Sequence, residues 1–144
     1  MSDAAAFTGF IPQIAAMERD CFREPWSEKT LEESAESGNR VFSVVSKDGE
    51  LLGYGIGVAA GDQGEIERLC VRKDARKQGI ARSIMNDLKA SLYALGAEVI
   101  FLEVRSRNVP AVSLYESLGY KKIGTRPKYY IDDDAVIFEL RLIP

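Results

Sequence analysis

The sequence predicts an α/β (α+β) fold, with about four helices on the faces of a mixed, mostly antiparallel sheet of seven strands. Early strand-like runs follow one another as hairpins, and later strands alternate with helices. The composition, 46% hydrophobic and 28% charged, is that of a globular chain and not of a disordered one. At 144 residues the chain has the length of one domain, which we expect to span residues 1–144.

The amino-terminal part predicts a weak opening strand and then two helices. Residues 9–21 carry apolar side chains at helical spacing. A second helix begins after Ser27, a typical N-cap residue, and ends near Gly38. Trp26 and Leu31 lie on either side of this start, as in a hydrophobic staple.

Three strands follow. Residues 40–46 and 51–59 are apolar and β-rich, and the Asp48-Gly49 pair between them is a strong hairpin signal. Residues 65–72 read as a third strand. Simple alternation along that strand predicts one face made of Ile66, Arg68 and Cys70.

The second half of the chain alternates helices and strands. Apolar residues at i+4 spacing predict a helix over 80–95, and a continuous apolar run predicts a central strand over 99–105. Another helix runs from an Asn108 cap to Gly119. Residues 120–126 and 135–142 complete the sheet.

Charge and residue types exclude several classes of function. The net charge of -3 gives no global attraction to nucleic acid or to an anionic membrane. The chain has no histidine, which removes the Ser-His pair and most zinc sites. Proton chemistry would fall to Glu, Asp, Tyr, Cys, Lys or water. We therefore expect no metal, no membrane partner and no direct nucleic-acid partner.

Cysteine usage and the absence of targeting signals bear on the compartment. Cys21 and Cys70 are far apart in sequence, and we predict neither a disulfide framework nor a metal site from them. No apolar run has the length of a membrane span, and the first ten residues lack the pattern of a signal peptide. A cytoplasmic protein, monomeric or weakly dimeric, is the expectation.

The most informative segment joins a strand to a helix through the basic loop 73–79. The first backbone N–H groups of a helix lack internal acceptors and lie at the positive end of its dipole, so they bind phosphate readily. Gly79 would let the backbone approach such a ligand without a Cβ in the way. The loop lacks both the Walker A residues and the three glycines of a dinucleotide fingerprint. A solvated basic helix start is the alternative interpretation.

The spacing Arg76-x-x-Gly79-x-Ala81 resembles the coenzyme A signature of the GNAT acetyltransferase superfamily. Nearly the whole chain is similar to the RimI family of bacterial ribosomal-protein alanine N-acetyltransferases. The similar segments are Pro25–Thr30, Leu102–Asn108, Leu114–Tyr120, and Arg126–Tyr130 followed by Asp134-Ala135. The resemblance implies a GNAT fold, acetyl-CoA as cosubstrate, and the N-terminal alanine of a small-subunit ribosomal protein as acceptor.

The resemblance also implies roles for individual residues. It assigns Glu103 as the proton acceptor and Tyr115 as the acid that protonates the leaving thiolate. It assigns contacts with the cosubstrate to Leu69, Cys70, Val71, Arg76, Lys77, Gln78, Gly79, Ile80, Ala81, Arg82 and Asn108. With no histidine to activate it, Cys70 is a poor candidate for a nucleophile.

The residues themselves leave alternatives to these roles. Burial of Glu103 in its apolar run would raise its pKa toward a useful range, but the carboxylate could instead pair with Arg105 or Arg107. An aromatic core position is the alternative for Tyr115. Other candidate bases, acting through water, are Glu65 and Glu67. Tyr129 and Tyr130 fit either an acceptor groove or packing at a strand edge.

The acceptor stays open. RimI sequences commonly read Leu-Asn-Ile-Ala-Val where this chain has residues 67–71, Glu-Arg-Leu-Cys-Val. An N-terminal α-amine, with a pKa of roughly 8, is easier to deprotonate than a lysine at roughly 10.4. The rivals are lysine side chains, and small amines such as a polyamine recognised by Asp132, Asp133 and Asp134 or by Glu65 and Glu67. A non-catalytic coenzyme A-binding module, or an RNA-binding surface at Arg105 and Arg107, would be a different class of protein.

Overall fold

The computed structural model describes residues 4–130 and 133–143. Its strands are β1 (Arg40–Lys47), β2 (Glu50–Ala60), β3 (Gln63–Val71), β4 (Val99–Arg105), β5 (Lys121–Tyr130) and β6 (Asp133–Arg141). They form one six-stranded sheet in the order β1-β2-β3-β4-β6-β5. The β3–β4 pair is parallel, and the other neighbouring pairs are antiparallel. The predicted mixed, mostly antiparallel sheet is therefore confirmed.

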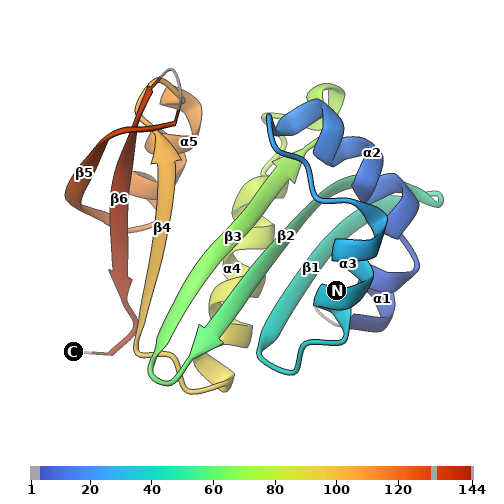
Figure 1. The fold of residues 1–144 in the computed structure, drawn as a ribbon, viewed down its shortest axis with the longest axis horizontal. Coiled ribbons are helices and arrows are strands. Elements are labelled where there is room, and N and C mark those ends of the chain that lie inside the picture. The colour runs from blue at the N-terminus through green and yellow to red at the C-terminus, as the bar shows by residue number, and fades with distance from the viewer. Residues whose placement is uncertain (1–3, 131–132, 144) are drawn as a thin grey trace.

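Helices cover both faces of this sheet (Figure 1). They are α1 (Ala4–Thr8), α2 (Ile11–Cys21), α3 (Glu28–Ala35), α4 (Ile80–Ala94) and α5 (Val109–Ser117), with a short 3₁₀ turn at Lys73–Ala75. As predicted, Ser27 and Asn108 cap α3 and α5 through their side-chain oxygens. Among the described residues, no helix has the length and apolar character needed to cross a lipid bilayer.

The predicted seventh strand at the amino terminus is wrong in the described part of the chain, where the helix α1 stands in its place. The run Ala4–Ala6 favours a helix over a strand. Phe7 then anchors the helix: its ring is fully buried and its centroid lies 4.3 Å from that of Phe42 in β1. The described residues thus contain one strand fewer and one helix more than expected.

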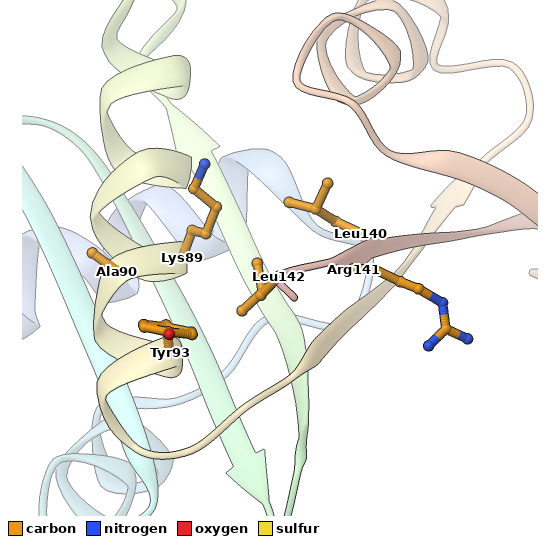
Figure 2. Close-up of a pocket in the computed structure, with 6 residues that line it drawn as sticks. All are labelled: Lys89, Ala90, Tyr93, Leu140, Arg141 and Leu142. Atoms are coloured by element: carbon orange, nitrogen blue, oxygen red, sulfur yellow. The ribbon is translucent and has the colours of Figure 1, made fainter. Parts of the chain in front are cut away.

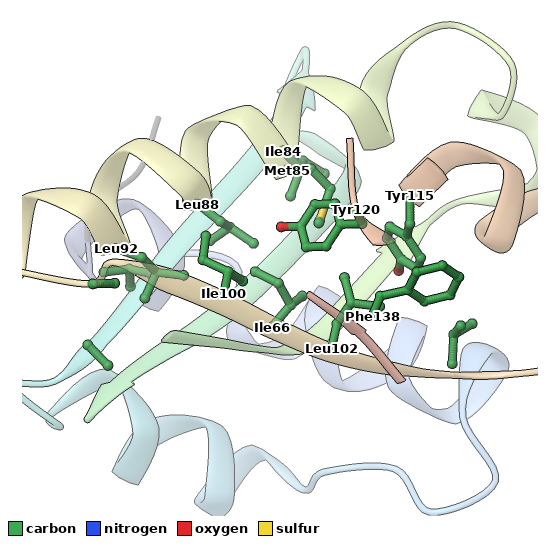
Figure 3. Packing of buried hydrophobic residues seen from close by; sticks show 14 of the residues in the cluster. Ile66, Ile84, Met85, Leu88, Leu92, Ile100, Leu102, Tyr115, Tyr120 and Phe138 are labelled. Atoms are coloured by element: carbon green, nitrogen blue, oxygen red, sulfur yellow. The ribbon is translucent and has the colours of Figure 1, made fainter. Parts of the chain in front are cut away.

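The sheet separates two hydrophobic clusters. The larger lies under α4 and α5, where Ile84, Leu88 and Leu92 are fully buried on the sheet beside Ile100 and Leu102 of β4 (Figure 3). This confirms the helical periodicity predicted for residues 80–95. The smaller cluster lies on the opposite face, under α1, α2 and α3.

Alternate glycines in β2 let α4 pack closely against the sheet. A Cβ placed on Gly55 would lie 2.6 Å from Cγ2 of Ile84 and 2.8 Å from Cδ1 of Leu88. Gly53 and Gly57 face the same helix, with similar approaches of about 3.1–3.2 Å to its side chains. The lack of a side chain at these positions therefore sets the distance between helix and sheet.

A β-bulge in β3 changes which residues face the helices. Pairing with β2 shifts between Ile56 and Gly57, so that Ile56 opposes Arg68 while Gly57 opposes Ile66. Glu67 is the extra residue between them. A bulge of this kind redirects the side chains that follow it.

The predicted alternation along β3 is wrong because of this bulge. Ile66 belongs to the cluster under α4, whereas Cys70 belongs to the cluster under α2. Arg68 also lies on the α2 face, where it contacts Glu18. Two consecutive polar residues, Glu67 and Arg68, consequently point to one side of the sheet.

The parallel pair β3–β4 is short and then opens. Only Gln63–Glu65 pair with Val99–Phe101, although β3 continues to Val71 and β4 to Arg105. The two strands diverge beyond the paired residues, as Figure 1 shows. The middle of the sheet is therefore split toward the carboxyl ends of these strands.

Cys21 and Cys70 are joined in a disulfide, contrary to the prediction from their separation of 49 residues. The bond ties the end of α2 to β3. The fold brings the two residues together because α2 crosses the face of the sheet onto which Cys70 points.

Candidate active site

A groove of about 1010 Å³ lies where β3 and β4 diverge. We call it the β3–β4 groove. Its walls come from the segment 22–26 after α2, from residues 65–69 of β3 and from residues 102–105 of β4. Asn108 at the start of α5, Tyr115 within that helix, and Arg126 and Tyr129 of β5 complete it. Such an opening between strand ends is where ligands commonly bind in mixed sheets.

Four glutamates line this groove: Glu24 from the segment 22–26, Glu65 and Glu67 from β3, and Glu103 from β4. The side chain of Glu103 is 23% exposed, and its Oε1 lies 2.9 Å from Nε of Arg126 in β5. Glu103 is thus half-buried and paired with Arg126, where the sequence analysis considered burial or a pair with Arg105 or Arg107. Alternation along β4 turns Glu103 toward the groove while its neighbours Leu102 and Val104 face the core.

Among the carboxylates that line the groove, Glu65 has a shifted pKa. The residue is exposed at the groove, but partial burial of its carboxyl group raises its pKa, and the nearby charges of Glu67 and Glu103 raise it further. Arg126 opposes the shift. The groove therefore holds two ion-paired carboxylates, Glu67 and Glu103, beside Glu65, which takes up a proton more readily.

Tyr115 and Asn108 reach the same groove from α5. The Oδ1 atom of Asn108 accepts a hydrogen bond from the backbone N–H of Ala111 at 3.3 Å. Tyr115 is 7% exposed, and its ring centroid lies 6.0 Å from that of Tyr120 and 6.3 Å from that of Phe138. Figure 3 shows the three rings within the same cluster. Tyr115 is therefore a core aromatic and a groove residue at once.

The loop before α4 has the backbone shape of an anion site. Lys77 and Gly79 both have positive φ, 64° and 82°. No atom lies within 4 Å of a Cβ built on Gly79, so its conformation, and not a close approach, requires glycine in this structure. The N–H of Ser83 donates to the Gly79 carbonyl at 3.0 Å, which leaves the N–H groups of residues 80–82 without acceptors inside the helix.

Two arginines near the start of α4, Arg76 and Arg82, form hydrogen bonds within the protein. Nε of Arg76 donates to the carbonyl of Val71 at 3.1 Å, which folds the loop back onto β3. Nη2 of Arg82 donates to the Ser117 hydroxyl at 2.7 Å and so links α4 to α5. The start of α4, the α5 helix and the end of β3 are thus held together on one side of the sheet.

The edge of β3 at Leu69–Val71 faces the split in the sheet. These residues pair with β2 on one side, but β4 has already diverged on the other. An exposed strand edge can bind an extended ligand as an added strand. Cys70 contributes only its backbone to such binding, because its sulfur is in the disulfide and the residue is 4% exposed.

The opposite wall of the groove holds a polar network that the sequence analysis missed. Arg68 Nη2 lies 3.4 Å from Oε1 of the fully buried Glu18 and donates to the Glu24 carbonyl at 3.0 Å. Its guanidinium lies over the rings of Phe22 and Trp26, 4.3 and 4.6 Å from their centroids. The sequence contains one sign of this network, because Glu18 falls on the apolar helical face of residues 9–21.

Some of the residues predicted to bind the acceptor line the groove, and others do not. Tyr129 lines the groove beneath Arg126, whose guanidinium lies 5.4 Å from the ring centroid; the Tyr130 side chain lies outside what is described. Asp133 instead holds the loop after β4, because its carboxylate accepts hydrogen bonds from the Ser106 hydroxyl and the Arg107 backbone N–H. These hydrogen bonds, the one from Ser106 first, lower its pKa. Asp132 lies outside the described residues.

A second hollow, of about 280 Å³, lies between α4 and the end of β6 (Figure 2). Its lining consists of Lys89, Ala90, Tyr93, Leu140, Arg141 and Leu142. It contains no carboxylate that could serve as a base. Within the described part of the chain, no group of three or more metal-ligating side chains is placed to hold an ion.

Comparison with known proteins gives one consistent result. The model of the acetyltransferase (GNAT) family matches residues 11–120. The [ribosomal protein bS18]-alanine N-acetyltransferase of Escherichia coli K12 is 30% identical over 135 residues, which cover 90% of each chain. The crystal structure of the Escherichia coli ribosomal-protein-S18-alanine N-acetyltransferase superimposes with a TM-score of 0.82 at 28% identity, covering 93% of this chain and 88% of that one.

A more distant structure shares the fold. Arabidopsis thaliana NAA60 in complex with acetyl-CoA superimposes with a TM-score of 0.82 at 19% identity, covering 99% of this chain and 97% of that one. Both superpositions extend over nearly the whole chain.

Proposed function

The chain belongs to the GNAT acetyltransferase family, and from this premise we propose that it acetylates the N-terminal α-amine of a protein, with the N-terminal alanine of a small-subunit ribosomal protein as acceptor. It is an acetyl-CoA-dependent N-acetyltransferase. The observation that carries the proposal is the β3–β4 groove, which brings Glu103, Tyr115 and Leu69 from three elements to one cavity. The 30% identity to the bS18-alanine enzyme supports the choice of acceptor.

Residues on the α4 side would hold the cosubstrate. Acetyl-CoA supplies the acetyl group as an activated thioester. The N–H groups of residues 79–82 and the exposed Lys77 and Gln78 would bind its pyrophosphate, because the loop presents several donors at a helix N-terminus. The edge at Leu69–Val71 would bind the extended arm, with Asn108 beside it.

Glu103 would accept the proton that the acceptor amine loses. An α-amine has a pKa of roughly 8, so a carboxylate needs to give only modest help at neutral pH. Arg126 orients this carboxylate through the 2.9 Å ion pair. A base fixed in direction by a second side chain is a common arrangement in catalytic sites.

Glu65 is the alternative base, acting through a water molecule. Its raised pKa and its place in the groove favour it. Comparing Glu103→Gln with Glu65→Gln decides between the two. The variant that loses kcat and the acidic limb of the pH profile identifies the base; unchanged turnover across pH in Glu103→Gln would remove it from the mechanism.

Tyr115 would donate a proton to the leaving sulfur. Its hydroxyl is on a residue buried at the groove wall, and phenol and thiol pKa values are close enough for such a transfer. Tyr115→Phe keeps the packing against Tyr120 and Phe138, so a fall in kcat in that variant would report the hydroxyl alone.

The carboxylates of the groove support a second acceptor class, in competition with the positive charge of Arg23, Arg68, Arg105 and Arg126 in the same lining. Glu65, Glu67 and Glu103 together would attract a polyamine or another small cationic amine. Incubation with acetyl-CoA and either alanine-initiated peptides, N-terminally blocked lysine peptides or polyamines, followed by mass spectrometry, separates the possibilities. Binding of acetyl-CoA without any product would instead indicate a non-catalytic module.

A further inference from the structure

We propose that Arg68 is a positioning residue that fixes the wall segment, residues 22–26, and thereby restricts which acceptor chain ends the groove takes. The nature of the acceptor rests on the proposed function; the positioning of the wall does not. Arg68 is one of the two residues placed on this face by the β3 bulge.

The wall segment bounds the groove on the side opposite the cosubstrate elements. Its residues line the groove together with Glu103 and Tyr115. It is a connection between α2 and α3 and belongs to neither helix. Its position must therefore come from side-chain contacts and not from a regular backbone ladder.

Arg68 supplies several of those contacts. It donates to the Glu24 carbonyl at 3.0 Å, and its guanidinium lies over the rings of Phe22 and Trp26. An arginine, with its planar fork and delocalised charge, suits this combination of stacking and hydrogen bonding. The backbone and both aromatic side chains of the segment are thus fixed to one strand residue.

The arginine is itself held by a buried acid. Glu18 is fully buried, receives a hydrogen bond from the Tyr54 hydroxyl and ion-pairs with Arg68 at 3.4 Å. The same carboxylate accepts from the backbone N–H of Trp26 at 2.8 Å. Glu18, from α2, and Arg68, from β3, therefore both hold the wall segment in place.

A second cation reinforces this position. Arg40 forms a bidentate pair with Glu67, at 2.8 and 3.2 Å, and its guanidinium lies 6.0 Å from the Trp26 ring centroid. Glu67 is the bulge residue beside Arg68. The bulge therefore places two side chains on one face of the sheet. Arg68 stacks on Trp26, and Glu67 pairs with the second arginine, Arg40.

The location of the network predicts which kinetic constant it controls. Arg68 and Glu18 lie on the α2 face, whereas α4, α5 and their loop lie on the other. A displaced wall would widen the acceptor side and leave the cosubstrate side intact. Loss of Arg68 should therefore weaken acceptor binding and flatten the preference among acceptors.

Two variants test this, and neither leaves an unpaired charge buried. The pair Glu18→Gln/Arg68→Met removes both charges at nearly constant volume and keeps a hydrogen-bonding group at residue 18. Arg68→Lys keeps the charge and loses the planar fork. The matched control is Arg141→Met, an exposed arginine ion-paired to Glu139 outside the groove.

Steady-state kinetics should use whichever amine the wild type accepts, with a panel of acceptors that differ in the first residue. We expect the acceptor KM to rise about tenfold in the double variant and less in Arg68→Lys, with the KM for acetyl-CoA within about twofold of wild type. The spread of kcat/KM over the panel should shrink, and Arg141→Met should match wild type.

An unchanged acceptor KM and preference in the folded double variant would overturn the proposal, as would an equal rise in both KM values. If the double variant fails to fold, the same criteria apply to Arg68→Lys. A wild type that acetylates only lysine side chains contradicts the proposed acceptor but leaves this test intact, because the variants are then measured with the lysine substrate.

Discussion

Nε of Arg126 lies 2.9 Å from Oε1 of Glu103, an ion pair that reaches across β6 between two strands that are not neighbours in the sheet. Glu103 opposes Ile137 and Arg126 opposes Ala135, so β6 sets the register that brings the two side chains together. The pair fixes the direction of the proposed base at the groove.

Arg126→Met should lower activity more than stability. The Arg126 side chain is 57% exposed, and such pairs contribute about 0–1 kcal/mol to folding. Without the pair Glu103 is no longer oriented, and we expect kcat/KM to fall about tenfold. Kinetics and a thermal melt of the same sample check this; a loss of several kcal/mol in stability with normal kcat/KM would contradict it.

Gly55→Ala should destabilise the fold through overpacking. The new methyl would lie 2.6 Å from Ile84, and relief of such a contact costs typically about 1–3 kcal/mol. The control is Gly38→Ala, whose methyl meets nothing within 4 Å. Chemical denaturation of both variants should show a large loss for the first and almost none for the second.

Glu65→Gln should change how stability depends on pH. A raised pKa means that folded Glu65 holds a proton at pH values where the unfolded chain has lost it, so wild-type stability falls as pH rises through that window. The variant lacks this fall. Urea midpoints across pH should match at acid pH and favour Glu65→Gln at neutral pH; a variant less stable than wild type at neutral pH would refute the assignment.

Reduction of the Cys21–Cys70 disulfide should lower stability. The bond closes a long loop, and such bonds contribute typically about 2–4 kcal/mol, mainly by restricting the unfolded chain. Denaturation with and without a reducing agent measures the difference. Cys21→Ala/Cys70→Ala, which has no bond to lose, should be insensitive to the reducing agent.

Features encoded by neighbouring residues could be predicted from the sequence. The Ser27 and Asn108 caps and the apolar face of α4 depend on residues within a few turns of one another. The loop at 76–82 was also recognisable, because its residues and the helix that follows are contiguous. For the same reason Glu65, Glu67 and Glu103 could be named as candidates from their strand positions.

What joins distant parts of the chain could not be predicted. The bulge at Glu67 depends on the register with β2, the partner of Glu103 on the register with β6, and the disulfide on the path of α2 across the sheet. The opening helix was missed because burial of Phe7 on β1 stabilises a segment too short to predict alone.

The central claim concerns the acceptor amine. The most direct test is a single peptide that begins with alanine and carries an internal lysine, incubated with the protein and acetyl-CoA, with the modified nitrogen located by fragmentation mass spectrometry. We predict one acetyl group on the alanine α-amine and a loss of that product in Glu103→Gln. Acetylation of the lysine side chain alone would contradict the account.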